Sequence, residues 1–386
     1  MKTERNFFLD EIGKHFHRTR PRVPEGFNST TYVEKDGRNT FVDIYIRSKG
    51  CHHNYLGGCT MCDYWVGREF NAFEMANYGK DTLKNLGFSP TVLVFGPSGS
   101  LFDEWEVPAS VRIELYKSLK VVNASVTGLF SRVETITDEK LDELVSYLDP
   151  SKISVEMGLE TSDPWKLKYC INKAIDVGLI TETIQSINKH KLKSSVYIMV
   201  DLPFLTMAES IDDAVSSVLW SIEQGVDYVV LFPMHLKPQT VAYWLYENGM
   251  CEPSSLWSLI EVLKRLPSRI LPKIGICWHR PRPDQSHPLY NESSIPPSTC
   301  SLCNEYVLSI LDTYRFSKNR FDLVNTLSNY DCSCKTVWQN KLQQSVDITL
   351  IERVKEAYKK MGISILGADW WEKHGEDVLQ NVSEVF

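Results

Sequence analysis

Between residues 41 and 276, short runs of apolar and β-branched residues alternate with longer segments of helical periodicity. This alternation is typical of repeated strand–helix units, in which helices join neighbouring parallel strands. One expected helix spans 208–224, where apolar residues recur at spacings of three and four. The alternation predicts six parallel strands, at 40–47, 91–95, 125–129, 153–156, 195–200 and 227–232.

Six such units predict an α/β fold, a partial (β/α)6 TIM-type barrel that is open enough for a bulky substrate. A doubly wound open sheet fits the same pattern. After residue 276 several prolines precede a helix expected near 304–312. We therefore expect an N-terminal extension at 1–40, the barrel at 41–276 and a small C-terminal module at 277–386. In either architecture the loops at the carboxyl ends of the strands should carry the function.

The loop after the first expected strand carries Cys51, Cys59 and Cys62. Three thiolates can bind three irons of a [4Fe-4S] cluster and leave the fourth iron open to another ligand. Glycines in the same segment would let the backbone wrap closely around such a cluster. Tyr64, just past the third cysteine, could pack against an adenine. The alternative is a structural zinc site with a neighbouring histidine, His52 or His53, as the fourth ligand.

This loop and the segments after it resemble the radical S-adenosylmethionine (SAM) superfamily. Within that superfamily, the chain is similar to RaSEA, the family of radical SAM subunits of archaeosine synthase, over roughly residues 35–340. The segments that carry the resemblance are 47–65 with its Gly-Gly-Cys-Thr-Met-Cys motif, 95–103, 131–132, 158–161, 171–173, 203–206 and the paired cysteines of the tail.

The resemblance implies that the cluster binds SAM, and that one-electron reduction cleaves SAM to methionine and a 5'-deoxyadenosyl radical. The radical would abstract hydrogen from the substrate, which leads to cleavage or rearrangement of a C–N or C–C bond by a lyase or transferase. An electron donor such as flavodoxin or ferredoxin would be a partner. The family acts on a lysine adduct of a 7-deazaguanine base in tRNA, so tRNA is one candidate substrate. A small metabolite or natural-product intermediate is the alternative.

Polar residues at the ends of the next strands are candidates for contacts with SAM. The turn at 95–100 presents amides and hydroxyls that suit the methionyl group, although an ordinary turn has the same composition. Arg132 could clamp the SAM carboxylate, unless it forms a surface ion pair. Glu160 would lie near the ribose hydroxyls or a substrate amine. The predicted cofactor-binding residues are Tyr64, Ser98, Gly99, Ser100, Ser131, Arg132 and Glu160.

Glu160 and Lys173 are the catalytic candidates, because Lys173 can balance the carboxylate or meet an anionic group of the substrate. The loops after the fifth and sixth strands should also border the substrate. For His235 a solvated loop residue is the alternative interpretation. The predicted substrate-contacting residues are Asn172, Lys173, Asp201, Phe204 and His235.

A second set of cysteines lies in the tail, as two pairs separated by about 30 residues. Four thiolates in this pattern suit a tetrahedral zinc ion, and they would also saturate an auxiliary iron-sulfur cluster. A structural zinc ion is our first expectation, because a small capping module with a limited hydrophobic core needs a bound metal for stability. The four residues are Cys300, Cys303, Cys332 and Cys334.

The formal net charge of -7 argues against a general nucleic-acid-binding surface. A tRNA substrate would therefore need a partner protein that supplies basic surface. No apolar stretch approaches the ~20 residues that span a bilayer, so we expect no membrane contact. The first residues alternate charged with apolar side chains instead of forming the apolar region of a signal peptide, so we expect a cytoplasmic location. In that location clustered cysteines are expected to be metal ligands or catalytic thiols rather than disulfides. The competing interpretation from another class of function is a non-catalytic metal-binding scaffold.

Overall fold

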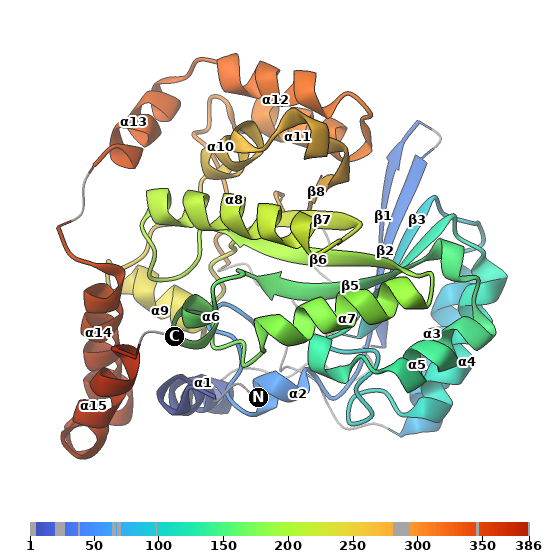
Figure 1. Ribbon diagram of the computed structural model, residues 1–386, viewed down its shortest axis with the longest axis horizontal. Helices are drawn as coiled ribbons and strands as arrows, with labels where there is room; N and C mark the ends of the chain where they lie inside the picture. Colours follow the sequence, from blue (N-terminus) through green and yellow to red (C-terminus); the bar gives the residue numbers. More distant parts are fainter. Residues whose placement is uncertain are drawn as a thin grey trace.

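The computed structural model describes residues 5–19, 28–37, 39–63, 67, 71–97, 99–280, 294–344 and 347–384. Within these residues lies an eight-stranded sheet whose strands follow one another in chain order (Figure 1). The first two strands are antiparallel, and the second to the eighth run parallel. The strands are β1 (Ser29–Asp36), β2 (Asn39–Ile46), β3 (Val92–Pro97), β4 (Val126–Phe130), β5 (Ile153–Glu160), β6 (Lys193–Val200), β7 (Tyr228–Pro233) and β8 (Ile274–Ile276).

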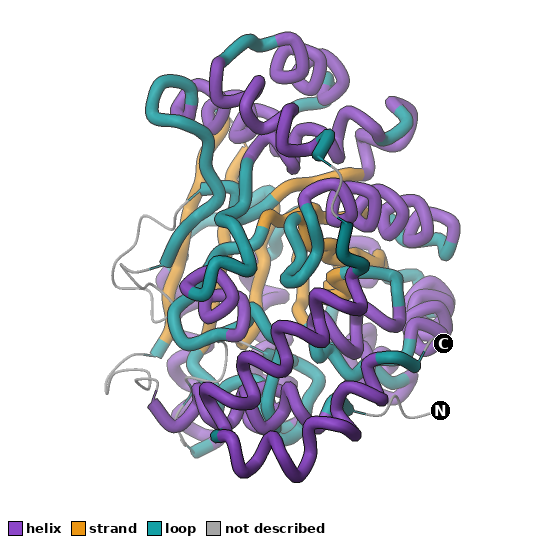
Figure 2. The backbone as a smooth tube through the Cα atoms, turned by 90° about the vertical axis from the view of Figure 1, so that its left-hand side faces the viewer, coloured by secondary structure: helices purple, strands orange, loops and turns teal. Residues whose placement is uncertain are grey.

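Helices connect the parallel strands and lie around the sheet (Figure 2). The helices up to β8 are α1 (Phe7–Thr19), α2 (His52–Tyr55), α3 (Ala72–Asn85), α4 (Ala109–Val122), α5 (Asp138–Tyr147), α6 (Pro164–Lys166), α7 (Val177–Lys189), α8 (Met207–Glu223), α9 (Val241–Glu247) and α10 (Leu256–Arg265). The tail contains α11 (Asn304–Phe316), α12 (Arg320–Asn329), α13 (Ser333–Leu342), α14 (Leu350–Met361) and α15 (Ala368–Val382). Shorter helical turns are η1 (Val133–Thr135), η2 (Pro150–Lys152), the π-helical η3 (Leu167–Ile171), η4 (Ser268–Lys273) and the π-helical η5 (Gly362–Leu366).

The sequential strand order confirms the predicted partial barrel. Six strand–helix units run from β2 and α3 to β7 and α10, with β8 as a further strand. A doubly wound sheet would instead reverse its strand order part of the way across. The carboxyl ends of β2 to β8 consequently lie at one end of the sheet, where the connecting loops meet.

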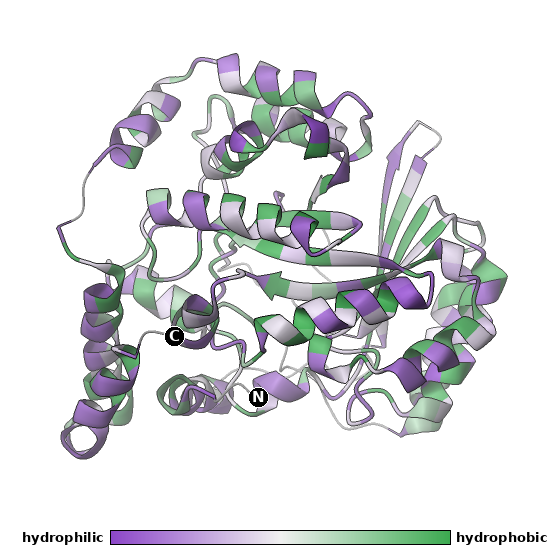
Figure 3. Cartoon of the chain, in the orientation of Figure 1, coloured by the Kyte–Doolittle hydropathy of each residue, from purple (hydrophilic) through white to green (hydrophobic). Residues whose placement is uncertain are grey.

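Side chains that alternate between the two faces of the sheet belong to two different hydrophobic cores. In β6, Val196, Ile198 and Val200 pack in the larger core between the sheet and its helices. Tyr197 and Met199 of the same strand belong to a second core on the other face. Helices such as α8 carry both hydrophobic and hydrophilic residues along their length, as expected for helices with one buried side (Figure 3). The sheet is therefore buried on both faces, as parallel strands require.

Local signals fix the start of α8. The hydroxyl of Thr206 accepts a hydrogen bond from the backbone N–H of Glu209, whose carboxylate accepts one from the backbone N–H of Thr206. This capping box satisfies two donors that a helix start would otherwise leave unpaired. Gly225, with a φ of 87°, follows the last turn and allows the chain to leave the helix.

The two ends of the chain meet beside the barrel. The rings of Phe8 in α1 and Tyr358 in α14 lie 4.5 Å apart between their centroids. The side-chain amide of Asn6 donates to the Tyr358 hydroxyl at 2.9 Å, and that hydroxyl donates to the Tyr169 carbonyl at 2.6 Å. Figure 1 shows α14 and α15 beside α1, whereas α12 lies against α10, and α11 contacts α12 and β8. The tail therefore contacts the barrel in two separate places.

A search for membrane-spanning helices over the described ranges finds none with the required length and apolar character.

Candidate active site

The loop after β2 holds the three predicted cluster ligands. Cys51 is buried, and Cys59 and Cys62 are partly exposed. After the single turn of α2 the chain reverses through Gly57, whose φ is 143°. A Cβ atom at Gly57 would lie 2.5 Å from the Cα of Asp10, so α1 packs directly on this turn. The loop is thereby enclosed between α1 and the barrel.

The π-helical segment after β5 fixes the cysteine loop from the other side. The backbone N–H of Thr60 donates to the Ile171 carbonyl at 2.9 Å, and the Thr60 hydroxyl donates to the Cys170 carbonyl at 2.7 Å. The amide of Asn172 donates to the Gly58 carbonyl at 2.8 Å. Asn172, predicted to contact substrate, thus lies against the cysteine loop. π-helical turns are frequent at functional sites.

His53 is turned away from the cysteines. Its Nε2 lies 2.7 Å from the Asn172 carbonyl, and because a carbonyl only accepts, this nitrogen carries the hydrogen. Burial, together with the charge of Arg132, holds the pKa of His53 well below its usual value. His52 instead stacks on the ring of Trp105 at 4.6 Å between centroids. Neither contact favours a histidine as the fourth ligand of a zinc site.

Two buried cations face the cysteines. Burial raises the pKa of the Cys51 thiol to about 12, and the charge of Arg132 opposes that shift. Burial likewise raises the pKa of Cys59 to about 12, against the charges of Lys173 and Arg132. Free thiols here would therefore be protonated at neutral pH, and a metal that binds thiolates would displace their protons.

The donor set fits a multi-iron cluster. Over the described part of the chain, the group of Cys, His, Asp and Glu ligand atoms that all lie within 4.8 Å of one another is in the tail, not in this loop. Cys51, Cys59 and Cys62 are still neighbours: burial is the main cause of the raised pKa of Cys51 and Cys59, and the charge of Cys62 is a smaller cause for both. In a [4Fe-4S] cluster each thiolate binds a different iron, so the three sulfurs need not all lie within 4.8 Å of one another.

Glu106 organises the turn after β3, a role that the sequence does not indicate. Its carboxylate accepts hydrogen bonds from the backbone N–H groups of Gly99 at 3.0 Å and Ser100 at 2.7 Å, and from the Ser48 hydroxyl. Burial raises the pKa of Glu106 to about 8. A Cβ atom at Gly99 would lie 2.8 Å from the Cα of Cys51. The amides predicted to meet SAM are thus bound to Glu106, and the turn packs on the first cysteine.

The end of β4 places Arg132 among these residues. Its Nη2 donates to the Lys173 carbonyl at 2.8 Å, and its Nε pairs with Glu134. The backbone N–H of Arg132 donates to the Ser100 hydroxyl at 3.0 Å, and the Ser131 hydroxyl accepts a hydrogen bond from the β3–α4 loop. Arg132 is therefore a buried residue of the site, and it also forms an ion pair with the partly exposed Glu134.

Glu160 and Lys173 form a buried ion pair at 2.8 Å, and only 8% of each side chain is exposed. Glu160 has a φ of 66° and follows an irregularity in the pairing of β5 with β6 at Gly158. Its Oε2 atom is buried and has no hydrogen-bond partner within the described structure. Strained backbone and unpaired polar atoms cost stability. They are found mostly at functional sites, where the function requires them.

Three predicted substrate residues are held elsewhere. Asp201 accepts a hydrogen bond from the start of α10, and burial raises its pKa to about 6. Phe204 packs edge-on against Tyr358 of α14. His235 donates from Nε2 to the Trp278 carbonyl at 2.6 Å. Tyr64 and Ser98 lie outside the described residues. The residues brought together are Cys51, Cys59, Cys62, Gly99, Ser100, Arg132, Glu160, Asn172 and Lys173.

A pocket opens beside the cysteine loop, between α1 and the loop before α9. Cys59 and Cys62 form part of its wall, together with Phe16 and His17 of α1. The pocket therefore lies between α1 and the cysteine loop.

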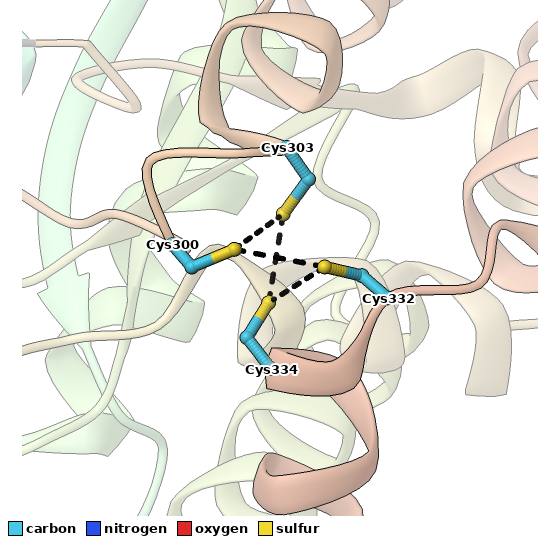
Figure 4. Close-up of side chains that lie close together, drawn as sticks. All are labelled: Cys300, Cys303, Cys332 and Cys334. Atoms are coloured by element: carbon cyan, nitrogen blue, oxygen red, sulfur yellow. Dashed lines mark hydrogen bonds between the residues drawn. The ribbon is translucent and has the colours of Figure 1, made fainter.

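The four tail cysteines come together as predicted (Figure 4). Cys300 and Cys303 precede α11, and Cys332 and Cys334 lie at the start of α13. Four of the distances between their sulfurs are 3.5 to 3.6 Å. The indole N–H of Trp257 in α10 donates to the Cys334 sulfur at 3.3 Å. This group could bind a metal ion.

Comparison with curated proteins supports the predicted resemblance. Archaeosine synthase subunit beta of Methanosarcina acetivorans is 28% identical over 311 residues, which cover 78% of this chain and 85% of that protein. The uncharacterized protein MJ0550 of Methanocaldococcus jannaschii is 27% identical over 311 residues, which cover 77% and 80%. No model of a protein family matches the chain. The chain is thus similar to the archaeosine synthase subunit over most of its length.

Solved structures with partly similar backbones include methylornithine synthase, with a TM-score of 0.45 and 16% identity over 69% of this chain and 70% of that one. Another is Elp3 of Methanocaldococcus infernus, with a TM-score of 0.40 and 15% identity over 55% of this chain and 53% of that one. A third is coproporphyrinogen III oxidase of Escherichia coli, with a TM-score of 0.37 and 15% identity, over 54% and 46%.

Proposed function

We propose that this chain is a radical SAM enzyme with a [4Fe-4S] cluster bound by Cys51, Cys59 and Cys62. The observation that carries the proposal is the set of three cysteines in one loop at the carboxyl end of β2, beside the buried cations Arg132 and Lys173. Three thiolates leave one iron open for SAM, and two nearby cations offset the negative charge of a thiolate-bound cluster. The similarity to archaeosine synthase subunit beta supports the same assignment.

The bound cluster and SAM would supply one-electron cleavage to methionine and a 5'-deoxyadenosyl radical, with an electron from a carrier such as flavodoxin or ferredoxin. The residues of the chain position the reactants. Arg132 would face the SAM carboxylate, and the unpaired Oε2 of Glu160 would accept a hydrogen bond from a ribose hydroxyl or a substrate amine. Lys173 fixes Glu160 in place through their ion pair. Roles for Tyr64, Ser98, Gly99, Ser100 and Ser131 in binding SAM stay predictions.

For the substrate we propose a lysine-modified 7-deazaguanine base in tRNA, whose C–N bond would be cleaved in a lyase-type reaction. The support is the similarity to a protein named as a subunit of archaeosine synthase. That name also points to a partner chain. The net charge of -7 favours such a partner for tRNA binding, because phosphate contacts need basic surface. A small metabolite is the competing substrate, and the scaffold without catalysis is the competing function.

The test is formation of 5'-deoxyadenosine. The protein, reconstituted with iron and sulfide without oxygen, is incubated with SAM and dithionite, and the product is followed by mass spectrometry. We expect the wild type to form 5'-deoxyadenosine, and Cys51→Ala, Cys59→Ala and Cys62→Ala to reduce it at least a hundredfold. Cys251→Ala is the matched control, because Cys251 lies in the loop before α10. It should keep wild-type cleavage.

Four outcomes separate the alternatives. Retained cleavage in the three cysteine variants would contradict the assigned ligands, and no cleavage by a loaded wild type would favour the scaffold. Stimulation by modified tRNA, but not by lysine-like metabolites, would support the tRNA substrate. Stimulation only by the metabolites would replace it with a small-molecule substrate.

We also propose that the tail cysteines bind a structural zinc ion. With Zn–S bonds of about 2.3 Å, the sulfurs of a tetrahedral site lie roughly 3.8 Å apart. The distances of 3.5 to 3.6 Å between the tail sulfurs are close to that value. In a [4Fe-4S] cluster each thiolate binds its own iron, and in a [2Fe-2S] cluster only two thiolates share an iron, so four sulfurs that all lie within 4.8 Å of one another do not fit either cluster. The geometry therefore favours a single ion over an auxiliary cluster.

A further inference from the structure

Asn54 places an amide on one of the proposed cluster ligands. It lies in the turn of α2, between Cys51 and Cys59, and only 1% of the residue is exposed. Its Nδ2 donates a hydrogen bond to the Cys62 sulfur at 3.3 Å. The partner of this amide is therefore a sulfur that the proposed function assigns to iron.

Stability alone does not account for an amide at this position. The Oδ1 atom of Asn54 is buried and has no hydrogen-bond partner within the described structure. A buried acceptor without a partner costs about 1–3 kcal/mol, and an apolar side chain would avoid that cost. The polar contact that remains is the one to Cys62. A flipped amide would point its oxygen at a thiolate, so the donor orientation is the favourable one.

The loop is shaped around this amide. A Cβ atom at Gly58 would lie 1.8 Å from the Asn54 Oδ1, and Gly58 has a φ of 82°. Only glycine therefore leaves room for the amide while the chain turns toward Cys59. Asn172 holds the carbonyl of Gly58 from the opposite side. The packing of the surrounding loop therefore fixes the position of the Asn54 amide.

We propose that Asn54 is a positioning residue that raises the reduction potential of the cluster through its hydrogen bond to Cys62. The inference rests on the proposed function, because it requires iron on that sulfur. A hydrogen bond to a ligating sulfur stabilises the extra negative charge of the reduced cluster more than the oxidised form. The amide would make the cluster easier to reduce by the one-electron donor.

The test measures the midpoint potential of the loaded cluster, without SAM or substrate. Wild type, Asn54→Leu and Asn54→Ala are reconstituted, and the reduced cluster is quantified by electron paramagnetic resonance at a series of fixed potentials. At the wild-type midpoint, we expect the ratio of reduced to oxidised cluster to fall about tenfold in both variants, a shift of about 59 mV for one electron. Tyr55→Ala is the control, because Tyr55 is the next residue of α2 and is 69% exposed. Its midpoint should equal that of the wild type.

The outcomes separate this inference from the proposed function. If the wild type takes up no iron, both fail. If the wild type loads and a loaded Asn54 variant keeps the wild-type midpoint, the inference alone is overturned. If both Asn54 variants lose iron while circular dichroism shows an intact fold, the amide holds the loop instead of setting the potential, which also overturns the inference.

Discussion

The buried pair of Glu160 and Lys173 gives a prediction at the scale of single residues. Removing one partner leaves the other charge buried and unpaired, which costs about 3–5 kcal/mol. We expect Lys173→Met and Glu160→Met each to lower the free energy of unfolding by that amount. The double variant should lose less than either single one, because neither member of the pair is then left buried without its partner. Urea unfolding of the metal-free protein in a double-mutant cycle measures this, and additive losses would contradict the pairing.

Glu156 predicts how stability depends on pH. It lies on β5, accepts a hydrogen bond from the Tyr197 hydroxyl, and burial raises its pKa from 4.5 to about 7. The unfolded chain releases this proton near pH 4.5 and the folded chain near pH 7. The contribution of Glu156 is therefore complete below pH 4.5 and is lost as the pH rises toward 7, on the order of 3 kcal/mol in all.

Glu156→Gln removes this titration. Its free energy of unfolding, measured by urea titration at intervals from pH 5 to pH 8, should fall less with rising pH than that of the wild type. Glu139→Gln, on the exposed first turn of α5, is the control and should keep the wild-type slope over this range. Equal slopes for wild type and Glu156→Gln would contradict the buried, protonated state of this carboxyl.

At the scale of residues, the sequence predicts the cysteines as ligands but not the residues that hold the neighbouring loops in place. The spacing of Cys51, Cys59 and Cys62 is a local pattern, and the loop confines them to one region. Glu106 lies in the segment 103–106, in which three of the four residues are acidic, and such a composition is typical of solvent-exposed turns. Its burial arises from backbone N–H groups seven and six residues earlier. Such a contact depends on how the turn folds, which residue types alone do not reveal.

At the scale of elements, α1 and the cysteine loop meet backbone to backbone. A Cβ atom at Gly13 would lie 1.9 Å from the Gly57 carbonyl oxygen. Gly13→Ala would favour the helix itself by up to about 1 kcal/mol, but the clash should outweigh this. We expect a net loss of about 1–3 kcal/mol and reduced iron uptake, because α1 must move off the loop.

Urea unfolding and iron analysis of Gly13→Ala test this contact. Lys14→Ala is the matched control, since Lys14 is exposed and its contact is with Glu11 on the same helix. It should change stability by less than about 0.5 kcal/mol. Wild-type stability and iron content in Gly13→Ala would show that α1 does not hold the loop.

The elements that the sequence predicts are those with a strong repeating pattern. Each of the six predicted strands overlaps one strand of the observed sheet, because buried parallel strands are continuous apolar runs. β1 was missed because it is a largely polar strand paired antiparallel at the sheet edge. β8 was missed because three residues are too short for a pattern. β5 continues to Glu160, four residues beyond its predicted end, through the irregular pairing near Gly158.

At the scale of the whole molecule, the tail links distant parts of the chain. The sequence predicts the metal-binding cysteines of 277–386, but not that α14 would pack on α1 at the far side of the barrel. That contact uses Phe8 and Tyr358, which are ordinary aromatic residues in the sequence. Pairing between them is a long-range event, and no spacing rule connects residues 350 positions apart. The tail cysteines, by contrast, form two closely spaced pairs, and this spacing alone predicts a metal site.

The proposed zinc ion should stabilise the molecule without serving the proposed reaction. The four cysteines join the loop before α11 to the start of α13, and Trp257 ties them to α10. We expect Cys300→Ser to remove the zinc and to cost about 3 kcal/mol, roughly 4 °C in Tm for a chain of this size. Formation of 5'-deoxyadenosine at low temperature should persist.

Metal analysis of a variant that lacks the proposed cluster ligands decides between zinc and an auxiliary cluster. In the triple variant of Cys51→Ala, Cys59→Ala and Cys62→Ala, the tail holds the remaining group of cysteines able to bind metal among the described residues. We expect one zinc per chain and no visible absorption from iron. Three to four irons per chain after reconstitution would overturn the zinc assignment, because a single tetrahedral ion cannot account for them.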